Sequence, residues 1–373
     1  MKSLRVFVLT AALICASGVL LYAQTAPRSY YVSATGDDSN NGRSEAAPFK
    51  TMYKAVEAAK AGVIKTITVI GTITVIGTYS SEINIWGAGS DEILITGKPD
   101  AGEAERAVFA SDSDIRESKI RFTHIEMKEV GIYQKSEVTM GRGVVAKGIL
   151  LGNRGSSLLM TDNASVTGGT GIGVYSDTVL IMRDTASITN HEGNGVFGDS
   201  YSDITLSDNA RISNNSRSGI DGENNCKVTL LDNAEISSNG GNGLGNGTIT
   251  MSGNVKINDN KGAGVNLEGG TLNMDGGTIS GNTSGGIHIG SKNEKGTCTI
   301  SSGTITGNKA EYGAGVYLER GTFTFTGGSI TGNEAEFVGG GVYVKSGANY
   351  TAGGGTVSDN TAGDGGNNVF RQQ

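Results

Sequence analysis

Short runs of alternating apolar and polar residues fill the chain from about residue 150 onward. In I-T-L at 204, V-T-L at 228 and F-T-F at 323, every second residue falls on the same face of an extended strand. The alternation predicts that Ile204 and Leu206 point inward, whereas Thr205 and Thr324 point outward. We therefore expect short strands, each with one buried face.

A second pattern recurs at a regular interval and groups these strands into repeats. It consists of an anchor Ile or Val, two small or polar residues and then Asn, as in I-S-N-N at 212 and I-T-G-N at 305. Successive copies, beginning with weaker ones at Val166 and Ile188, lie 21 to 27 residues apart. A third, Gly-rich segment such as G-A-G-V-Y-L at 313 completes each repeat. Three short strands per repeat predict an all-β fold, a right-handed parallel β-helix with three faces and roughly ten or more coils.

The Asn of this pattern predicts a column of stacked side chains. Coils of a parallel β-helix lie about 4.8 Å apart, so equivalent residues of successive coils lie above one another. Asn tolerates the left-handed backbone of a tight corner, and stacked amides can hydrogen-bond along the column. The predicted column consists of Asn215, Asn239, Asn260, Asn282, Asn308, Asn333 and Asn360.

Composition supports this interpretation. The chain has 60 Gly but only 3 Pro, and all three prolines precede residue 100. Glycine suits corners with positive φ, and a long sequence without Pro suits strands that are paired on both sides. Collagen is excluded, because it needs Gly at every third residue together with abundant Pro.

The N-terminal part of the chain differs from the repeats. Residues 49–61 have the one convincing amphipathic helical pattern, with Met52, Ala55, Val56 and Ala59 along one stripe. A solenoid exposes its core at an open end, so we expect this helix to be a cap. The predicted organisation is a signal peptide at 1–23, an N-terminal segment with the capping helix at 24–62, irregular coils at 63–150 and regular repeats at 151–373.

The first residues predict export. Lys2 and Arg5 precede an apolar stretch that ends at Tyr22, and cleavage is expected after Ala23. Removing residues 1–23 deletes two positive charges and no negative one, so the formal net charge moves from −7 to −9. An acidic surface argues against nucleic acid or an anionic membrane as partner. We expect no membrane-spanning segment in the mature chain, and an extracellular or outer-membrane-associated location with the periplasm as the alternative.

The two cysteines of the mature chain are expected not to pair. Cys298 takes the inward place that Leu272 and Phe323 take in adjacent coils, three coils beyond the coil of Cys226. Three layers correspond to roughly 14 Å, whereas the Cα atoms of a disulfide lie within about 7 Å of each other. Both residues are predicted to be buried free thiols.

Two parts of the chain resemble known families. Y-Y-V-S-A-T-G-D-D-S-N-N-G-R-S-E-A-A-P-F-K-T at 30–51 is similar to the start of secreted bacterial β-helix proteins, including some polysaccharide lyases. I-T-G-N-K-A-E-Y-G-A-G-V-Y at 305–317 and I-T-G-N-E-A-E-F-V-G-G-G-V-Y at 330–343 resemble the repeats of polymorphic outer-membrane proteins and related surface adhesins. The resemblances imply an exported β-helix protein at the bacterial surface.

Four acidic residues form a candidate metal site. Asp162, Asp184, Asp208 and Asp232 each stand four residues before the anchor in successive coils, so they are expected to stack. Stacked carboxylates must stay solvated, raise their pKa values or hold a cation such as Ca²⁺. The competing interpretation is a corner in which Asp opens a turn and the following Asn or Gly takes the left-handed conformation. We favour the corner, because Ca²⁺ needs six or more oxygens; no cofactor is then required.

An aromatic column is the candidate binding site. The neighbours of Tyr317 in its strand face inward, so Tyr317 faces outward, and His288, Tyr343 and Phe370 take the same place in adjacent coils. Rings on a rigid sheet can stack on sugars or anchor a protein partner. Aromatic residues in register also stabilise a ladder by themselves. His124 and His191 are isolated, and His191 replaces the column Asn in an early coil.

Two hypotheses about function follow. The first is an exported, non-catalytic β-helix protein at the bacterial surface, adhesin-like or glycan-contacting, with a polysaccharide or a cell-surface protein as partner. It rests on the signal peptide, the repeats and a sequence without a Ser-His pair or zinc-ligand spacing. The alternative is a polysaccharide lyase or glycoside hydrolase acting on cell-surface or extracellular polysaccharide.

Overall fold

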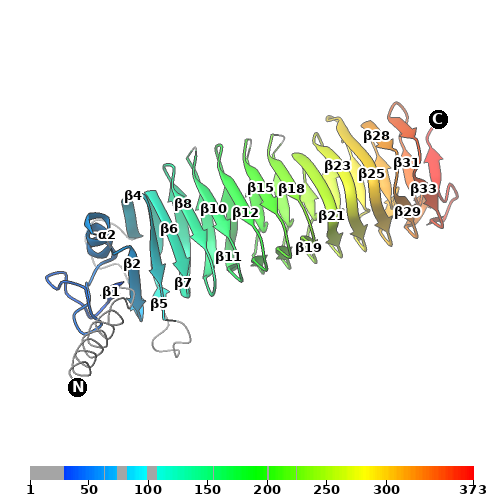
Figure 1. Cartoon of the computed structure of the whole chain (residues 1–373). Helices are drawn as coiled ribbons and strands as arrows, with labels where there is room; N and C mark the ends of the chain where they lie inside the picture. The colour runs from blue at the N-terminus through cyan, green and yellow to red at the C-terminus, as the bar shows by residue number, and fades with distance from the viewer. Residues whose placement is uncertain are drawn as a thin grey trace, which may run out of the picture.

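The computed structural model describes residues 29–62, 64–73, 82–98, 107–153, 155–199, 201–223 and 225–373. The predicted signal peptide lies outside these ranges. Within them the chain is an all-β parallel solenoid of about 12 turns, which confirms the predicted β-helix (Figure 1).

Each turn contributes strands to three faces, which we call A, B and C in chain order. The strands that lie on face A alone are β1 (Ser29–Ser33), β2 (Thr66–Ile70), β8 (Glu137–Met140), β10 (Ser157–Met160), β12 (Val179–Met182), β15 (Asp203–Leu206), β18 (Lys227–Leu230), β28 (Gly321–Phe325) and β32 (Asn349–Ala352). Those on face B alone are β3 (Thr72–Ile73), β5 (Ala107–Phe109), β13 (Ser187–Thr189), β16 (Arg211–Ser213), β19 (Glu235–Ser237), β29 (Ser329–Thr331) and β33 (Thr356–Ser358). Those on face C alone are β14 (Val196–Gly198), β17 (Ile220–Gly222), β20 (Leu244–Gly245), β22 (Val265–Leu267), β24 (Ile287–Ile289), β27 (Val316–Leu318), β31 (Val342–Val344) and β35 (Val369–Arg371).

Longer strands pass from one face to the next without a break. They are β4 (Glu82–Thr96), β6 (Asp112–Thr123), β7 (Ile125–Tyr133), β9 (Val145–Leu151), β11 (Ser165–Val174), β21 (Thr248–Asn258), β23 (Thr271–Ser280) and β25 (Gly296–Thr306). A small separate sheet, which the repeat pattern did not predict, joins β26 (Lys309–Tyr312), β30 (Glu334–Val338) and β34 (Thr361–Ala362) between faces B and C.

Burial follows the alternation that the sequence predicts. Ile204 and Leu206 are fully buried, whereas Thr205 between them is half-buried on the outer side. The helix α2 (Met52–Ala61) buries the predicted stripe of Met52, Ala55, Val56 and Ala59. It packs on β1, β2 and β4 at the N-terminal end of the solenoid, as expected of a cap (Figure 1).

The predicted Asn column is present, but its backbone geometry differs from the prediction. All seven side chains are buried, and each amide oxygen from Asn239 onward accepts hydrogen bonds from the Asn one coil earlier, as in Asn239 Nδ2 to Asn260 Oδ1 at 2.9 Å. The left-handed residue is not the Asn but the one before it, for example Ser238 with φ 57° and Asp259 with φ 58°. The turn before each Asn therefore directs its amide into the core, where the neighbouring amides satisfy its hydrogen bonds.

A column of glycines on face C lies against these buried amides. A Cβ atom at Gly243 would lie 2.9 Å from Asn260 Nδ2, and one at Gly264 would lie 2.8 Å from Asn282 Nδ2. Such distances are too short for any side chain. The glycine that precedes each G-V-Y-type strand is therefore required by the Asn column and is not evidence of a ligand site.

Both cysteines of the described chain are free and buried, as predicted. Cys298 pairs in register with Leu272 on one side and with Phe323 on the other. Burial raises the pKa of the Cys226 thiol to about 12 and the pKa of Cys298 well above its ordinary value, so both are unreactive packing residues.

Candidate functional site

One outward position of face C can be followed in register along most of the solenoid. Its occupants change from small and apolar side chains, through polar ones, to aromatic ones. In chain order they are Gly131, Leu150, Gly173, Phe197, Asp221, Gly245, Asn266, His288, Tyr317, Tyr343 and Phe370. The four residues of the predicted aromatic column are therefore consecutive members of a longer row.

Within the aromatic column the rings cover one another. The rings of Tyr317 and Tyr343 are stacked with centroids 5.2 Å apart, and those of Tyr343 and Phe370 with centroids 5.6 Å apart. His288 meets Tyr317 edge to face at 4.8 Å. Tyr312 in the neighbouring small sheet closes a further side of Tyr343, which is only 7% exposed. The column presents mainly ring edges to solvent, so it offers few faces on which a sugar can stack.

Charged groups accompany the aromatic column on one side. Lys345 Nζ lies 2.8 Å from Glu319 Oε1, and His288 Nε2 lies 3.5 Å from Glu319 Oε2. The hydrogen bond from Lys345 holds the pKa of Glu319 below its ordinary value, while burial lowers the pKa of His288. Glu319 is thus an ionised carboxylate that already forms an ion pair with Lys345.

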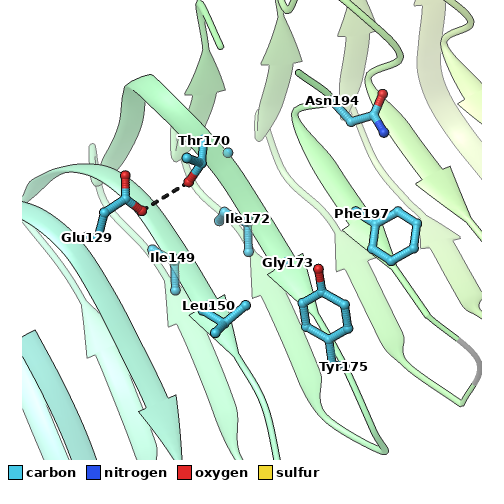
Figure 2. A pocket seen from close by; sticks show the side chains of 10 residues that line it. Glu129, Ile149, Leu150, Thr170, Ile172, Gly173, Tyr175, Asn194 and Phe197 are labelled. Atoms are coloured by element: carbon cyan, nitrogen blue, oxygen red, sulfur yellow. Dashed lines mark hydrogen bonds between the residues drawn. The ribbon is translucent and has the colours of Figure 1, made fainter. Parts of the chain in front are cut away.

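A second part of the same row forms a trench. At Gly173 of β11 the row has no side chain of its own between Leu150 of β9 and Phe197 of β14, and the Tyr175 ring lies over this position (Figure 2). The trench encloses about 290 Å³, and Tyr175 closes one end, its ring 5.7 Å from that of Phe197 and tilted by 44°. Unlike the rings of Tyr317, Tyr343 and Phe370, these two are not stacked face to face.

Glycine at position 173 is what opens this trench. A Cβ atom there would lie 2.4 Å from Cε2 of Tyr175, so the Tyr175 ring occupies the space of the missing side chain. Gly173 does not have a positive φ, so the backbone itself does not demand glycine. The missing side chain lets Tyr175 lie across the strand as part of the trench.

Polar groups line the other end of the trench. Thr170 Oγ1 donates to Glu129 Oε2 at 3.0 Å across two coils (Figure 2). This contact passes over Gly148, where a Cβ atom would lie only 2.1 Å from the same carboxylate oxygen. Asn194 Nδ2 donates to Asp221 Oδ2 at 3.1 Å. Asp221 lies beyond Asn194, and burial raises the pKa of its carboxyl group. Glu129 is the one charged side chain among the ten residues that line the trench.

The four aspartates of the candidate metal site do form a column, and the carboxylates of the last three accept hydrogen bonds from the coil before them. Asp162 N donates to Asp184 Oδ2 at 3.0 Å, and the backbone nitrogens of Asp184 and Asp208 donate to the next aspartate at 3.2 Å each. All four aspartates have φ between 55° and 57°, so the left-handed residue of the corner is the aspartate itself. We had expected the Asn or Gly that follows it to adopt this conformation.

The hydrogen bond from Thr161, followed by that from Asp162, lowers the pKa of Asp184. The structure thus gives this aspartate column a role in closing the corner. Across the ranges that the structure describes, no group of three or more His, Cys, Asp or Glu side chains is arranged to hold a metal ion.

His191 begins the buried Asn column, as its position in the sequence suggested. Its backbone N–H donates to Asn215 Oδ1, and its Nδ1 accepts from Gly169 N at 3.2 Å. Nε2 then donates to the Val166 carbonyl oxygen at 3.1 Å, which defines a neutral ring. Every polar atom of this histidine has a structural partner.

Known proteins show similarity at the level of the fold alone. No family model matches the chain, and no curated protein matches its sequence. Among solved structures, pectate lyase Pel9A is 18% identical, with 91% of this chain and 79% of that chain covered and a TM-score of 0.34. The A-module of the Azotobacter vinelandii mannuronan C-5 epimerase AlgE6 is 14% identical, with 86% and 93% covered and a TM-score of 0.38. A rhamnogalacturonan lyase is 14% identical, with 90% and 84% covered and a TM-score of 0.26.

The helical segments that the structure describes are too short and too polar to cross a membrane. Sequence reasoning identified the aromatic column but missed the trench. The available signal was Gly173, which occupies an outward position of a strand rather than a corner.

Proposed function

We propose that this chain is an exported, non-catalytic β-helix protein that contacts a glycan through the trench between Leu150 and Phe197. The observation that carries the proposal is the trench beside Gly173, bordered by the rings of Tyr175 and Phe197. Its volume of about 290 Å³ lies just below the range of small-ligand sites, about 300 to 1,000 Å³. Such a size suits a short segment of a longer chain.

The lining of the trench has the two kinds of surface that a sugar requires. A pyranose ring has apolar C–H faces, which pack on aromatic rings, and hydroxyl groups around its edge. Thr170, Asn194 and the Glu129 carboxylate can accept from or donate to such hydroxyls. With one carboxylate and no cationic side chain in the lining, the trench favours a neutral glycan over a polyuronate.

The test is binding of the purified chain to neutral and acidic oligosaccharides, measured by titration calorimetry. Phe197→Ala is expected to weaken binding of the preferred neutral oligosaccharide roughly two- to ten-fold, since a ring contact contributes roughly 0.5 to 1.5 kcal/mol. Phe370→Ala is the matched control, because it removes a half-buried phenyl ring from the same row at the far end of the solenoid. Equal losses in both variants, or no binding by the parent chain, would contradict the proposal.

The same samples also address the alternative of a polysaccharide lyase or glycoside hydrolase. Incubation with each glycan, with and without Ca²⁺, is expected to leave chain length unchanged. Turnover that disappears in a variant carrying Asp208→Asn and Asp232→Asn would replace the binding proposal with the enzymatic one.

A further inference from the structure

Face A carries two rows of outward threonines that neither the trench nor the aromatic column uses. They lie on β21, β23, β25, β28 and β32, and eight of the ten positions are Thr, the others Asn. We call these ten residues the threonine array. The first row is Thr248, Thr271, Thr297, Thr322 and Asn349, and the second is Thr250, Asn273, Thr299, Thr324 and Thr351.

The array is regular in two directions. Every neighbouring pair in both rows is in direct register, and the register shifts on β21, β23 and β25 all lie outside it. Neighbouring strands are spaced about 4.8 Å apart, and residues i and i+2 of a strand are about 6.6 Å apart. Hydroxyl and methyl groups therefore repeat on a rectangular grid that is four strand spacings long, or roughly 19 Å.

A rigid base holds this grid in place. On the first four strands the inward residues between the two rows are Ile249, Leu272, Cys298 and Phe323, all fully buried, and on β32 it is Tyr350, which is partly buried. Threonine is β-branched and restricted at χ1, so successive side chains present their hydroxyl and methyl groups in a similar orientation. The order of the backbone ladder thus extends to the outer surface.

The threonine hydroxyls are available to solvent. None of the eight makes a side-chain hydrogen bond to another residue in the described part of the chain, whereas on face B Ser329 Oγ lies 3.3 Å from Thr304 Oγ1. No array position is charged, and the charged residues Lys227, on the adjacent strand β18, and Asp275, on β23, lie just outside it. The array is an uncharged surface with ordered hydroxyl and methyl groups.

Most classes of partner fit this surface poorly. Protein partners are anchored by Trp, Tyr and Arg, whereas Thr is under-represented among residues that dominate interface energy. Nucleic acids and polyanionic glycans require a basic surface. A soluble sugar requires a concavity or an aromatic ring, and the array has neither. A periodic lattice of water needs only hydroxyls at regular spacing and methyl groups between them.

We propose that the threonine array binds ice. The hydroxyls hydrogen-bond a first layer of water in a repeating arrangement, and that layer joins the surface lattice of an ice crystal. The methyl groups fill the spaces between these waters and exclude disordered ones. Many weak contacts then add across the rigid grid, so the interaction depends on the order of the array as a whole.

The test is the shaping of single ice crystals and the inhibition of ice recrystallisation by the purified full chain. The parent chain is expected to produce faceted crystals and to slow recrystallisation. Thr299→Lys at the centre of the array is expected to lose faceting and to weaken inhibition several-fold. Thr324→Val, which keeps the methyl group and replaces the hydroxyl with a second methyl group, is expected to lose only part of the inhibition.

Thr306→Lys is the matched control, because Thr306 lies on the same strand β25 but faces outward on face B. It is expected to behave like the parent chain, and thermal unfolding by circular dichroism must show that both lysine variants are folded. Unfaceted crystals from the parent chain, or equal loss in Thr299→Lys and Thr306→Lys, would overturn the proposal. Adsorption to microcrystalline cellulose that Thr299→Lys abolishes, without any effect on ice, would assign the array to a crystalline polysaccharide instead.

Discussion

The trench and the aromatic column belong to one outward row of face C, yet their side chains are used in opposite ways. Near the C-terminal end, Tyr317, Tyr343 and Phe370 stack on each other, so neighbouring rings cover their faces. In the trench, the rings of Tyr175 and Phe197 are tilted by 44° to each other, and Gly173 contributes no side chain between Leu150 and Phe197.

The difference shows that an aromatic row on a solenoid is not by itself a binding surface. When every coil contributes a ring, the spacing of about 4.8 Å favours stacking within the protein, and the rings stabilise the ladder. When glycine interrupts the row, a ring face and a space become available together. The interruption at Gly173, rather than the abundance of rings, indicates the binding site.

The largest expected effect is on stability and concerns Tyr343. Its ring is 7% exposed and packs between two other rings, so Tyr343→Ala is expected to lower the free energy of unfolding by about 3 kcal/mol. Urea unfolding followed by circular dichroism measures this change, with Phe197→Ala as the comparison. A loss in Phe197→Ala as large as that in Tyr343→Ala would erase the distinction between column and trench.

A smaller effect is expected from pH and sharpens the interpretation of the column. Burial, the main cause, lowers the pKa of His288, although Glu319 favours its protonated form. The unfolded chain then binds a proton more readily, so this histidine contributes stability above about pH 6.5 that is lost as the pH falls through its lowered pKa.

Parallel unfolding midpoints of the parent chain and His288→Gln, measured between pH 7.5 and 5, isolate this contribution. The difference between the two is expected to shrink as the pH falls, because the parent loses the stability of its neutral histidine. A parent chain that instead gains stability on acidification relative to His288→Gln would show that the ion pair with Glu319 outweighs burial.

The sequence predicted most of the fold because the fold repeats. Alternation placed Ile204 and Thr205 on opposite sides of a strand, and the period placed Tyr317 next to Tyr343. The helical stripe from Met52 to Ala59 was also correct, since burying an apolar stripe against the end of a solenoid needs no long-range information.

The sequence could not supply the details that depend on backbone dihedrals or on a missing side chain. It assigned the left-handed conformation to the column Asn, whereas residues such as Ser238 adopt it. The Asn amide forms its hydrogen bonds with neighbouring amides inside the column rather than with the turn. It also missed the trench, because Gly173 in a glycine-rich chain looks like one more corner residue. Its role in the trench becomes visible only from its outward position between Leu150 and Phe197.

The most direct test of the central claim is to fill the trench without removing any ring. Gly173→Val places a β-branched side chain in the row and displaces Tyr175, while the φ of this position accepts any residue. Titration with the preferred oligosaccharide is expected to show that Gly173→Val loses binding while Tyr317→Ala binds like the parent chain. Binding that survives Gly173→Val but is lost in Tyr317→Ala would contradict a binding site in the trench and would place the site on the aromatic column.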